Sequence, residues 1–263
     1  MRLIVNILVC LFLVPQEGEP QGEFLETMEK EMVKVGNRLY ASKYETYNAQ
    51  YNVFLDYLIE NNRIQDLEIA RPDSSQWEQV DTVFIPLAKF YRWHPAYSRY
   101  PAVNISYEAA VLYCDWLTEQ YMAYPKKIFK EVKFRLPSEV EWVNAARGGL
   151  KDIIYPWGSN QVTNDEGVAL CNFWQFGDSG YNSKDSKVED FAISTVPVNS
   201  YFINGFGVYN MSGNVAEMTS RKGFAKGGSW RSSSEDVRID ARQQYDVPSP
   251  LIGFRVFMDV LEE

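Results

Sequence analysis

The chain has 263 residues, which is enough for one large domain or two small ones. Apolar residues make up 46% of it and charged residues 23%, which is a globular rather than a disordered composition. The net charge of −9 argues against nucleic acid as a partner, because phosphate binding needs a basic surface. A single histidine, His94, leaves almost no material for a histidine-based zinc site or a Ser-His-Asp triad.

The first sixteen residues (1–16) predict a signal peptide. One basic residue precedes an apolar run from Leu3 to Val14, which is too short to span a bilayer and has the length of a signal-peptide core. A buried N-terminal strand is the alternative that this pattern leaves open. Val9 before Cys10 argues against a lipid anchor, since lipidation there would want a small residue. We therefore expect an exported protein of the periplasm or cell envelope.

Residues 17–32 are polar and acidic, so we expect a tether there, followed by one domain over residues 33–263. Within that domain, apolar residues near helical spacing predict a helix between Tyr44 and Asn62. Scattered prolines and aromatic residues over 63–106 predict loops with short strands.

Two further helices have clear boundaries. Apolar residues recur at helical spacing after Ser106, a predicted N-cap, and Cys114 lies on the face that they form. Ser138 and Glu141 have the spacing of a capping box, and the glycine pair that ends at Gly149 stops this second helix. Little periodicity follows, so the chain is predicted to be α+β with much loop.

Cys114 and Cys171 are the two cysteines that remain once the apolar leader is set aside. An exported protein could join them, but two cysteines provide no disulfide framework. The apolar helical face around Cys114 favours a buried free thiol.

Seven segments follow one another between Tyr44 and Phe257. They read YNAQYNVFL, YPAVNISYEAAVLYCDWL, RLPSEVEWVNAARGG, YPWGSN, NGFGVYNMSGNVAEM, KGGSWRSS and IGFRVF. In this order the segments resemble the formylglycine-generating enzyme, or sulfatase-modifying-factor, domain family. The resemblance implies that family's C-type-lectin-like fold, an α+β fold with little regular secondary structure.

A narrower resemblance begins at Phe90. The segment FYRWHPAYSRYPAVNISYEAA is similar to envelope lipoproteins of the gliding-motility and type IX secretion machinery. Those proteins carry this domain as structural parts. The resemblance implies a protein partner in the envelope, with membrane association through that partner.

The resemblance also identifies where the family's chemistry would lie. The family enzyme oxidises a sulfatase cysteine to formylglycine with two cysteines that bind copper, and a thiolate pair suits Cu(I). Ser232 and Val237 occupy those two positions here, and Ala216 and Met218 replace two family tryptophans. We therefore expect no copper and no formylglycine reaction. A second family branch makes sulfoxides with iron held by several histidines, which this chain lacks.

The serine run from Ser232 to Ser234 offers a possible nucleophile. A serine needs an activating base, and nothing in the sequence places His94 nearby. A solvated loop is the interpretation that we favour for this run.

The family's two calcium sites correspond to polar turns of this chain. By resemblance, each site combines side-chain oxygens with backbone carbonyls, and Ca²⁺ prefers such hard oxygen ligands. The first site corresponds to Asn210, Gly213, Val215 and Glu217. The second corresponds to Asn172, Phe173, Asp190 and Ala192, with a longer intervening loop than is usual in the family. A turn held by hydrogen bonds alone is the alternative for both.

Together these observations predict a non-catalytic, calcium-stabilised structural or protein-binding component of the bacterial cell envelope, of a gliding or type IX secretion apparatus. Two alternatives from other classes stay open. One is a divergent enzyme acting in the same groove, which a convergent set of perturbed acids would favour. The other is a lectin-like module that binds sugar or peptide, which a shallow pocket with an aromatic platform would favour.

Overall fold

The computed structural model describes residues 19–174 and 193–263. The predicted signal peptide, Asp190 and Ala192 lie outside these residues. Within the described ranges, no helix combines the length and the apolar character that crossing a membrane would require.

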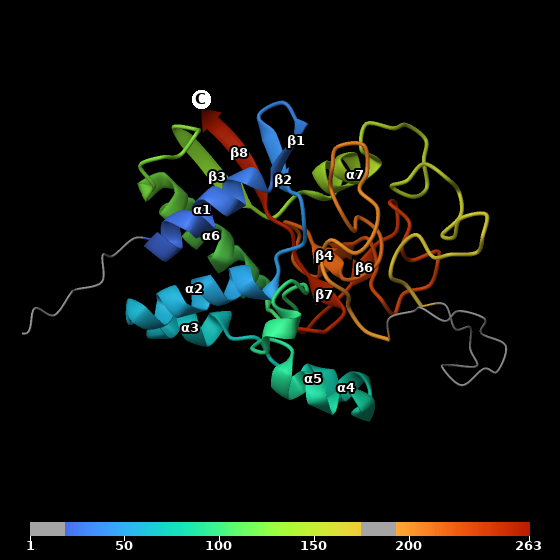
Figure 1. Ribbon diagram of the computed structural model, residues 1–263, viewed down its shortest axis with the longest axis horizontal. Helices are drawn as coiled ribbons and strands as arrows, with labels where there is room; N and C mark the ends of the chain where they lie inside the picture. Colours follow the sequence, from blue (N-terminus) through green and yellow to red (C-terminus); the bar gives the residue numbers. More distant parts are fainter. Residues whose placement is uncertain (1–18, 175–192) are drawn as a thin grey trace, which may run out of the picture.

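An antiparallel sheet joins the two ends of the described chain. Its strands are β1 (Met32–Gly36), β2 (Leu39–Ser42), β8 (Phe257–Glu262) and β3 (Glu131–Arg135), in this spatial order. Met258 pairs with Tyr40 on one side and with Phe134 on the other, so β8 is central (Figure 1). The last described strand therefore completes a sheet that the first strands begin.

Four helices lie together beside this sheet: α1 (Glu19–Lys30), α2 (Asn48–Glu60), α3 (Ile64–Ala70) and α6 (Tyr107–Ala123) (Figure 1). Aromatic rings fill the space between them. Phe54 of α2 contacts Tyr113 and Trp116 of α6, with ring centroids 5.5 and 5.1 Å apart. Such tilted and edge-to-face pairs stabilise a core beyond the area that they bury.

Residues 19–32, most of the predicted tether 17–32, are not a tether in the structure. Glu19–Lys30 form helix α1, whose Leu25 and Met28 are 3% and 2% exposed. The many acidic residues made this segment look solvent-exposed in the sequence. In the structure, some of them accept hydrogen bonds from hydroxyl groups. Tyr124, for example, donates a 2.8 Å hydrogen bond to Glu26.

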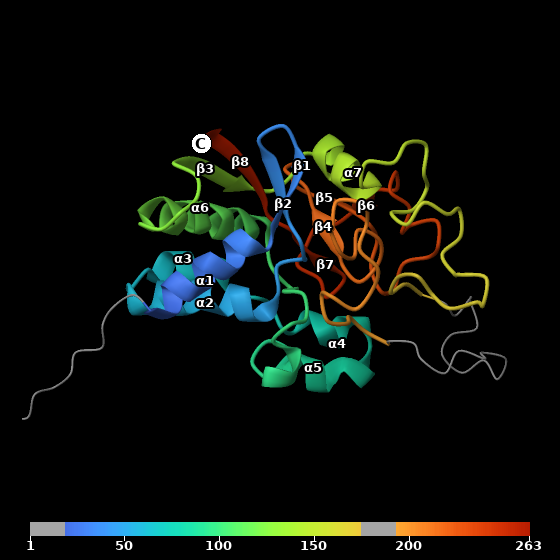
Figure 2. The same ribbon diagram turned by 45° about the horizontal axis from the view of Figure 1, so that its top comes forward.

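The loops and short strands predicted over 63–106 are also wrong. This segment contains α3, α4 (Gln76–Val80), α5 (Ile85–Phe90) and two 3₁₀ turns, η1 (Thr82–Phe84) and η2 (Pro95–Tyr97). The proline in the first turn of α5 is compatible with a helix, since the first turn has no internal N–H partner. Figures 1 and 2 show α4 and α5 at the edge of the molecule, far from the β1-β2-β8-β3 sheet.

The two best-defined helix starts are confirmed. Ser106 Oγ accepts from the Ala109 N–H at 3.1 Å at the start of α6. Ser138 and Glu141 form the expected capping box of α7 (Glu139–Arg147), which ends at Gly148 in the left-handed conformation (φ 56°). These signals are local, so they can be read without knowledge of the tertiary structure.

The rest of the described chain is loop with a small second sheet. Its strands β6 (Gln243–Gln244), β5 (Phe224–Lys226), β4 (Ala216–Met218) and β7 (Ile252–Gly253) are each two or three residues long. Only β4 and β7 pair in parallel within this described sheet. The mixture of helices, two sheets and long loops confirms the predicted α+β class. Cys114 and Cys171 are both buried and free.

Leu25→Ala tests whether α1 is part of the core. We expect the free energy of unfolding to fall by about 2–5 kcal/mol, because the change removes buried methyl groups and leaves a cavity. Val140→Ala is the matched control, since Val140 is 69% exposed on α7. Equal effects of the two changes in a urea titration would show that α1 contributes no core packing.

Candidate functional site

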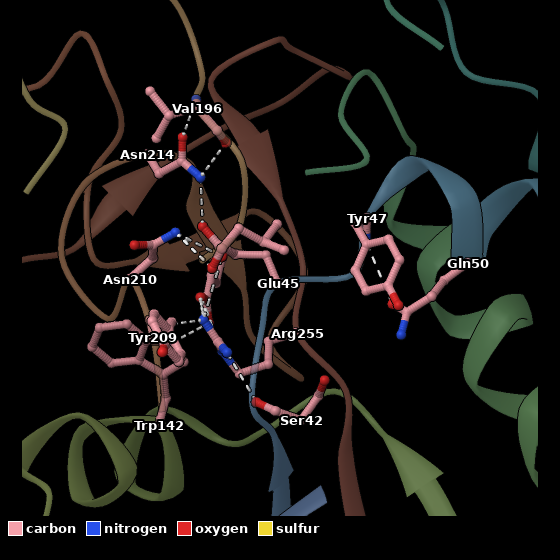
Figure 3. Close-up of polar contacts among 12 residues, drawn as sticks. Ser42, Glu45, Tyr47, Gln50, Trp142, Val196, Tyr209, Asn210, Asn214 and Arg255 are labelled. Atoms are coloured by element: carbon pink, nitrogen blue, oxygen red, sulfur yellow. Dashed lines mark hydrogen bonds and ion pairs between the residues drawn. The ribbon is translucent and has the colours of Figure 1, made fainter. Parts of the chain in front are cut away.

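Arg255 is at the centre of the candidate site. It lies between β7 and β8 with no exposed surface, and Figure 3 shows its guanidinium surrounded by oxygen atoms. It donates to the carbonyls of Ser42 at 2.9 Å and Tyr209 at 2.8 Å. It also donates to the Glu217 carboxylate, with the shortest contact at 2.6 Å. A planar guanidinium with five N–H donors can satisfy this many acceptors, whereas a lysine ammonium has only three.

Glu217 of β4 is buried and uses both carboxylate oxygens. Oε1 accepts from Nε and Nη2 of Arg255, while Oε2 accepts from Nε of Arg255 and, at 2.7 Å, from Nε1 of Trp142. Three N–H groups therefore point at this carboxylate, and the one on Nε of Arg255 is shared between the two oxygens. Protein donors therefore already satisfy Glu217.

Glu45 is a second buried carboxyl group, on the segment between β2 and α2 (Figure 3). Asn214 donates to its Oε1 at 2.8 Å and Asn210 to its Oε2 at 3.1 Å, while Nη2 of Arg255 lies 4.0 Å away. Burial raises the pKa of Glu45 to about 8, although Arg255 opposes that shift. Two carboxyl groups thus share one guanidinium, so a proton or another cation is needed to balance them.

Asn210 and Asn214 come from one tight turn, and both have positive φ (52° and 64°). Asn214 uses its amide to hold the neighbouring loop, since it accepts from Val196 N and donates to Val196 O. Asn210 donates to Val198 O at 3.2 Å, but its own Oδ1 is buried without a hydrogen-bond donor. A buried acceptor without a partner is costly, and a bound cation would satisfy it.

The structure brings part of the first predicted calcium set together. Asn210 and Glu217 both contact the Glu45–Arg255 pair, and Gly213 and Val215 lie on the turn between them. Asn210 fits a metal ligand because its Oδ1 is free of donors. Glu217 fits only if it gives up an Arg255 or Trp142 contact.

Gly213 is needed here for the backbone shape. Its φ is 75°, and a Cβ at this position would lie 2.3 Å from the Asn172 carbonyl oxygen. That carbonyl accepts from Asn214 N at 2.8 Å, so two loops meet too closely for a side chain.

Only half of the second predicted set can be located. Asn172 is buried and donates from Nδ2 to Ser194 O at 2.9 Å, while Phe173 packs beside Cys171. Asp190 and Ala192 lie outside the described residues. Over 19–174 and 193–263, no group of three or more acidic, histidine or cysteine side chains is arranged to hold a metal.

Val237 and Ser232, at the positions of the family's copper ligands, have structural roles in this chain. Val237 has no exposed surface and lies in an apolar cluster with Tyr155 and Cys171. Burial raises the pKa of the Cys171 thiol, which disfavours the thiolate that a metal would need. Ser232 Oγ accepts from Ser229 N at 2.9 Å, so this side chain closes a turn. No base among the described side chains contacts the serine run apart from acidic neighbours such as Asp236, which Ser233 reaches at 2.8 Å.

Sequence reasoning missed Glu45. The available signal for Glu45 was an acidic residue inside the aromatic segment KYETYNAQY, just before a helix. Its partners lie far along the chain, and a contact of that kind has no local sequence signature.

Arg255→Met measures how much the site depends on this residue. We expect a loss of about 3–5 kcal/mol in the free energy of unfolding, because two buried carboxyl groups lose their cation. Arg231→Met, at an exposed arginine, is the control. In a double-mutant cycle, adding Glu217→Gln should recover part of the loss. An Arg255→Met effect no larger than that of the control would contradict this assignment.

Comparison with known proteins supports the fold and the family. The family model of the sulfatase-modifying factor enzyme 1-like domain matches residues 16–260. Among solved structures, PvdO from Pseudomonas aeruginosa aligns with a TM-score of 0.55 at 21% identity, over 84% of this chain and 80% of that one. CarF aligns with a TM-score of 0.54 at 19% identity, over 84% and 86%. At these identities the structures support the fold alone.

Sequence relatives include both active and inactive members. A formylglycine-generating enzyme from Mus musculus is 30% identical over 202 residues, covering 69% of this chain and 48% of that protein. One from Thermomonospora curvata is 37% identical over 144 residues, covering 54% and 40%. An inactive C-alpha-formylglycine-generating enzyme 2 from Bos taurus is 33% identical over 141 residues, covering 53% and 36%. The chain thus spans less than half the length of these relatives, and by its family match it belongs to the sulfatase-modifying factor enzyme 1-like (formylglycine-generating enzyme) domain family.

Proposed function

We propose that this chain is a non-catalytic, calcium-stabilised component of the bacterial cell envelope that binds another protein. The packed Val237 and the turn-closing Ser232 support the absence of copper chemistry. The leader-like first sixteen residues support export to the periplasm or envelope. The segment that begins at Phe90 supports a role in an apparatus of the gliding or type IX secretion kind.

The observation that carries this proposal is the exposed apolar surface of residues 82–93, which we call the α5 segment. None of the residues of α5 is buried. Large apolar side chains are exposed along the segment: Val83 (60%), Ile85 (40%), Phe90 (53%) and Trp93 (61%). Several large apolar side chains exposed on one short segment are typical of surfaces that bind proteins.

A cavity of about 340 Å³ adjoins the α5 segment and offers a place for a partner's anchor residue. Phe84, Trp174 and Trp230 line it, together with the charged residues Asp81 and Arg231. Trp174 N donates to the Ser232 carbonyl at 2.9 Å, so the cavity lies beside the position of the family's first copper ligand. Aromatic and arginine side chains around a pocket are the residues that contribute most binding energy at interfaces.

Photo-crosslinking tests the proposed partner surface. A photo-reactive phenylalanine analogue is placed at Phe90, at Trp93, or at the control Val140 on α7, in cells that express the protein naturally. We expect the same envelope protein to be crosslinked from Phe90 and from Trp93 and not from Val140. Trp93→Ala should then weaken binding of that purified partner by about tenfold or more. Crosslinks that are absent, or equally strong from Val140, would refute the proposal.

A thermal melt with metal analysis tests the proposed calcium. We expect the purified protein to contain calcium and no copper, and its melting temperature to fall in EDTA and recover with Ca²⁺. At about 100 Kd of free Ca²⁺, binding adds roughly 2.7 kcal/mol to stability. Asn210→Ala should abolish the response to Ca²⁺, because it removes the unsatisfied Oδ1. Asn160→Ala, on an exposed loop, should keep it. An EDTA-insensitive melt of the unaltered protein would exclude structural calcium.

A further inference from the structure

A hollow of about 680 Å³ lies between the loops of residues 150–170 and 202–205. In Figures 1 and 2 the yellow loops of residues 150–170 are on the opposite side of α7 from β3 and β8. It shares no lining residue with the cavity beside the α5 segment. Its volume falls within the range of small-molecule and cofactor sites.

An immobilised tryptophan forms one wall of the hollow. The Trp157 ring lies parallel to that of buried Tyr155, with centroids 5.1 Å apart and an interplanar angle of 4°. Its Nε1 donates to Ser159 Oγ at 3.1 Å and to the Gln161 carbonyl at 2.9 Å. Tyr155 in turn donates to Ser234 O at 2.9 Å. The indole is therefore fixed in position before any ligand arrives, which lowers the entropy lost on binding.

Exposed apolar side chains of a second loop also line the hollow. Phe202 is 65% exposed and Ile203 is 50% exposed, although both line the hollow. The next residue, Asn204, is buried and fixes this loop. Its Nδ2 donates to the carbonyls of Ala145 and Ala146, and its Oδ1 accepts from two backbone N–H groups of its own turn. These hydrogen bonds hold the loop in place, so Phe202 stays exposed to solvent although it is not packed in a core.

Polar side chains of the hollow have unused hydrogen-bonding capacity. The side chains of Asn160, Gln161, Thr163 and Asp165 line the hollow and make no hydrogen bond or ion pair with other described residues. Two are amides and one is a hydroxyl, so they can both donate and accept. No lysine or arginine lines the hollow, and Asp165 is the one carboxylate among its lining residues.

We infer that this hollow is a binding site for a neutral oligosaccharide. A sugar ring has an apolar C–H face that packs on an indole, and its hydroxyl groups match amides and hydroxyls that both donate and accept. An anionic ligand finds no positive charge here and meets Asp165. A purely apolar ligand would leave the amides without partners. This inference does not depend on the partner surface or on calcium, and it adds a second recognition surface to the protein.

Binding of defined glycans to the full chain tests this site. The probes are neutral oligosaccharides of glucose, mannose, galactose and N-acetylglucosamine on an array, with sialylated and sulfated glycans beside them. Any neutral glycan that is retained is then titrated by calorimetry. We expect at least one neutral glycan to bind, and Trp157→Ala to weaken it by about tenfold or more. Gln161→Ala and Phe202→Ala should also weaken it, and both change exposed side chains that the fold does not need.

Trp93→Ala is the matched control, because it removes an exposed tryptophan from the α5 segment instead. It should leave glycan affinity unchanged. Three results would overturn the inference: no neutral glycan binds the unaltered chain, only acidic glycans bind, or the glycan affinity survives both Trp157→Ala and Gln161→Ala.

Discussion

A guanidinium that has no contact with water must find all its acceptors within the protein, and this requirement organises the structure around Arg255. Its acceptors come from β2, from the loop at Tyr209 and from β4. Through Glu217, the same group reaches Trp142 on α7. The two sheets share no strand, so Arg255 is a polar connection between them. Removing either partner of such a buried pair leaves an uncompensated charge, which fixes the relative position of the elements that supply it.

In the loop-rich half of the protein, asparagine side chains make hydrogen bonds to the backbone that neighbouring strands would make in a sheet. Long irregular segments leave backbone N–H and C=O groups that strands would have paired. Asn214 supplies a donor and an acceptor to Val196, whereas Asn204 donates to the end of α7 and accepts from its own turn. Asparagine also tolerates positive φ, so one residue type can both shape a turn and satisfy its neighbours.

The sequence allowed accurate prediction only where the controlling contacts are local. The Ser106 and Ser138 caps and the glycine stop of α7 involve residues at most a few positions apart, and the structure confirms them. Helix α1 was missed because its apolar side is narrow and its acidic residues dominate the composition. The short helices of 63–106 have too few turns to show a period. Glu45 was missed because Asn210 and Asn214, its partners, are joined to it only by the fold. The order of helices and irregular segments indicated the α+β class, whereas the family resemblance supplied the C-type-lectin-like fold and the Asn210–Glu217 turn.

The position of β8 has a consequence for the order in which the protein folds. Asp259 of β8 pairs with Leu39 of β2 on one side and with Lys133 of β3 on the other. The first sheet therefore cannot join β2 to β3 until β8, the last described strand, is present. Contacts between such distant parts of a chain form slowly, because a large loop must close before any of them is made. Strands β1 and β2 can pair with each other early, but β2 and β3 each lack a neighbour until β8 has been synthesised. The β1-β2-β8-β3 sheet is therefore completed only after residues 257–262 have been synthesised.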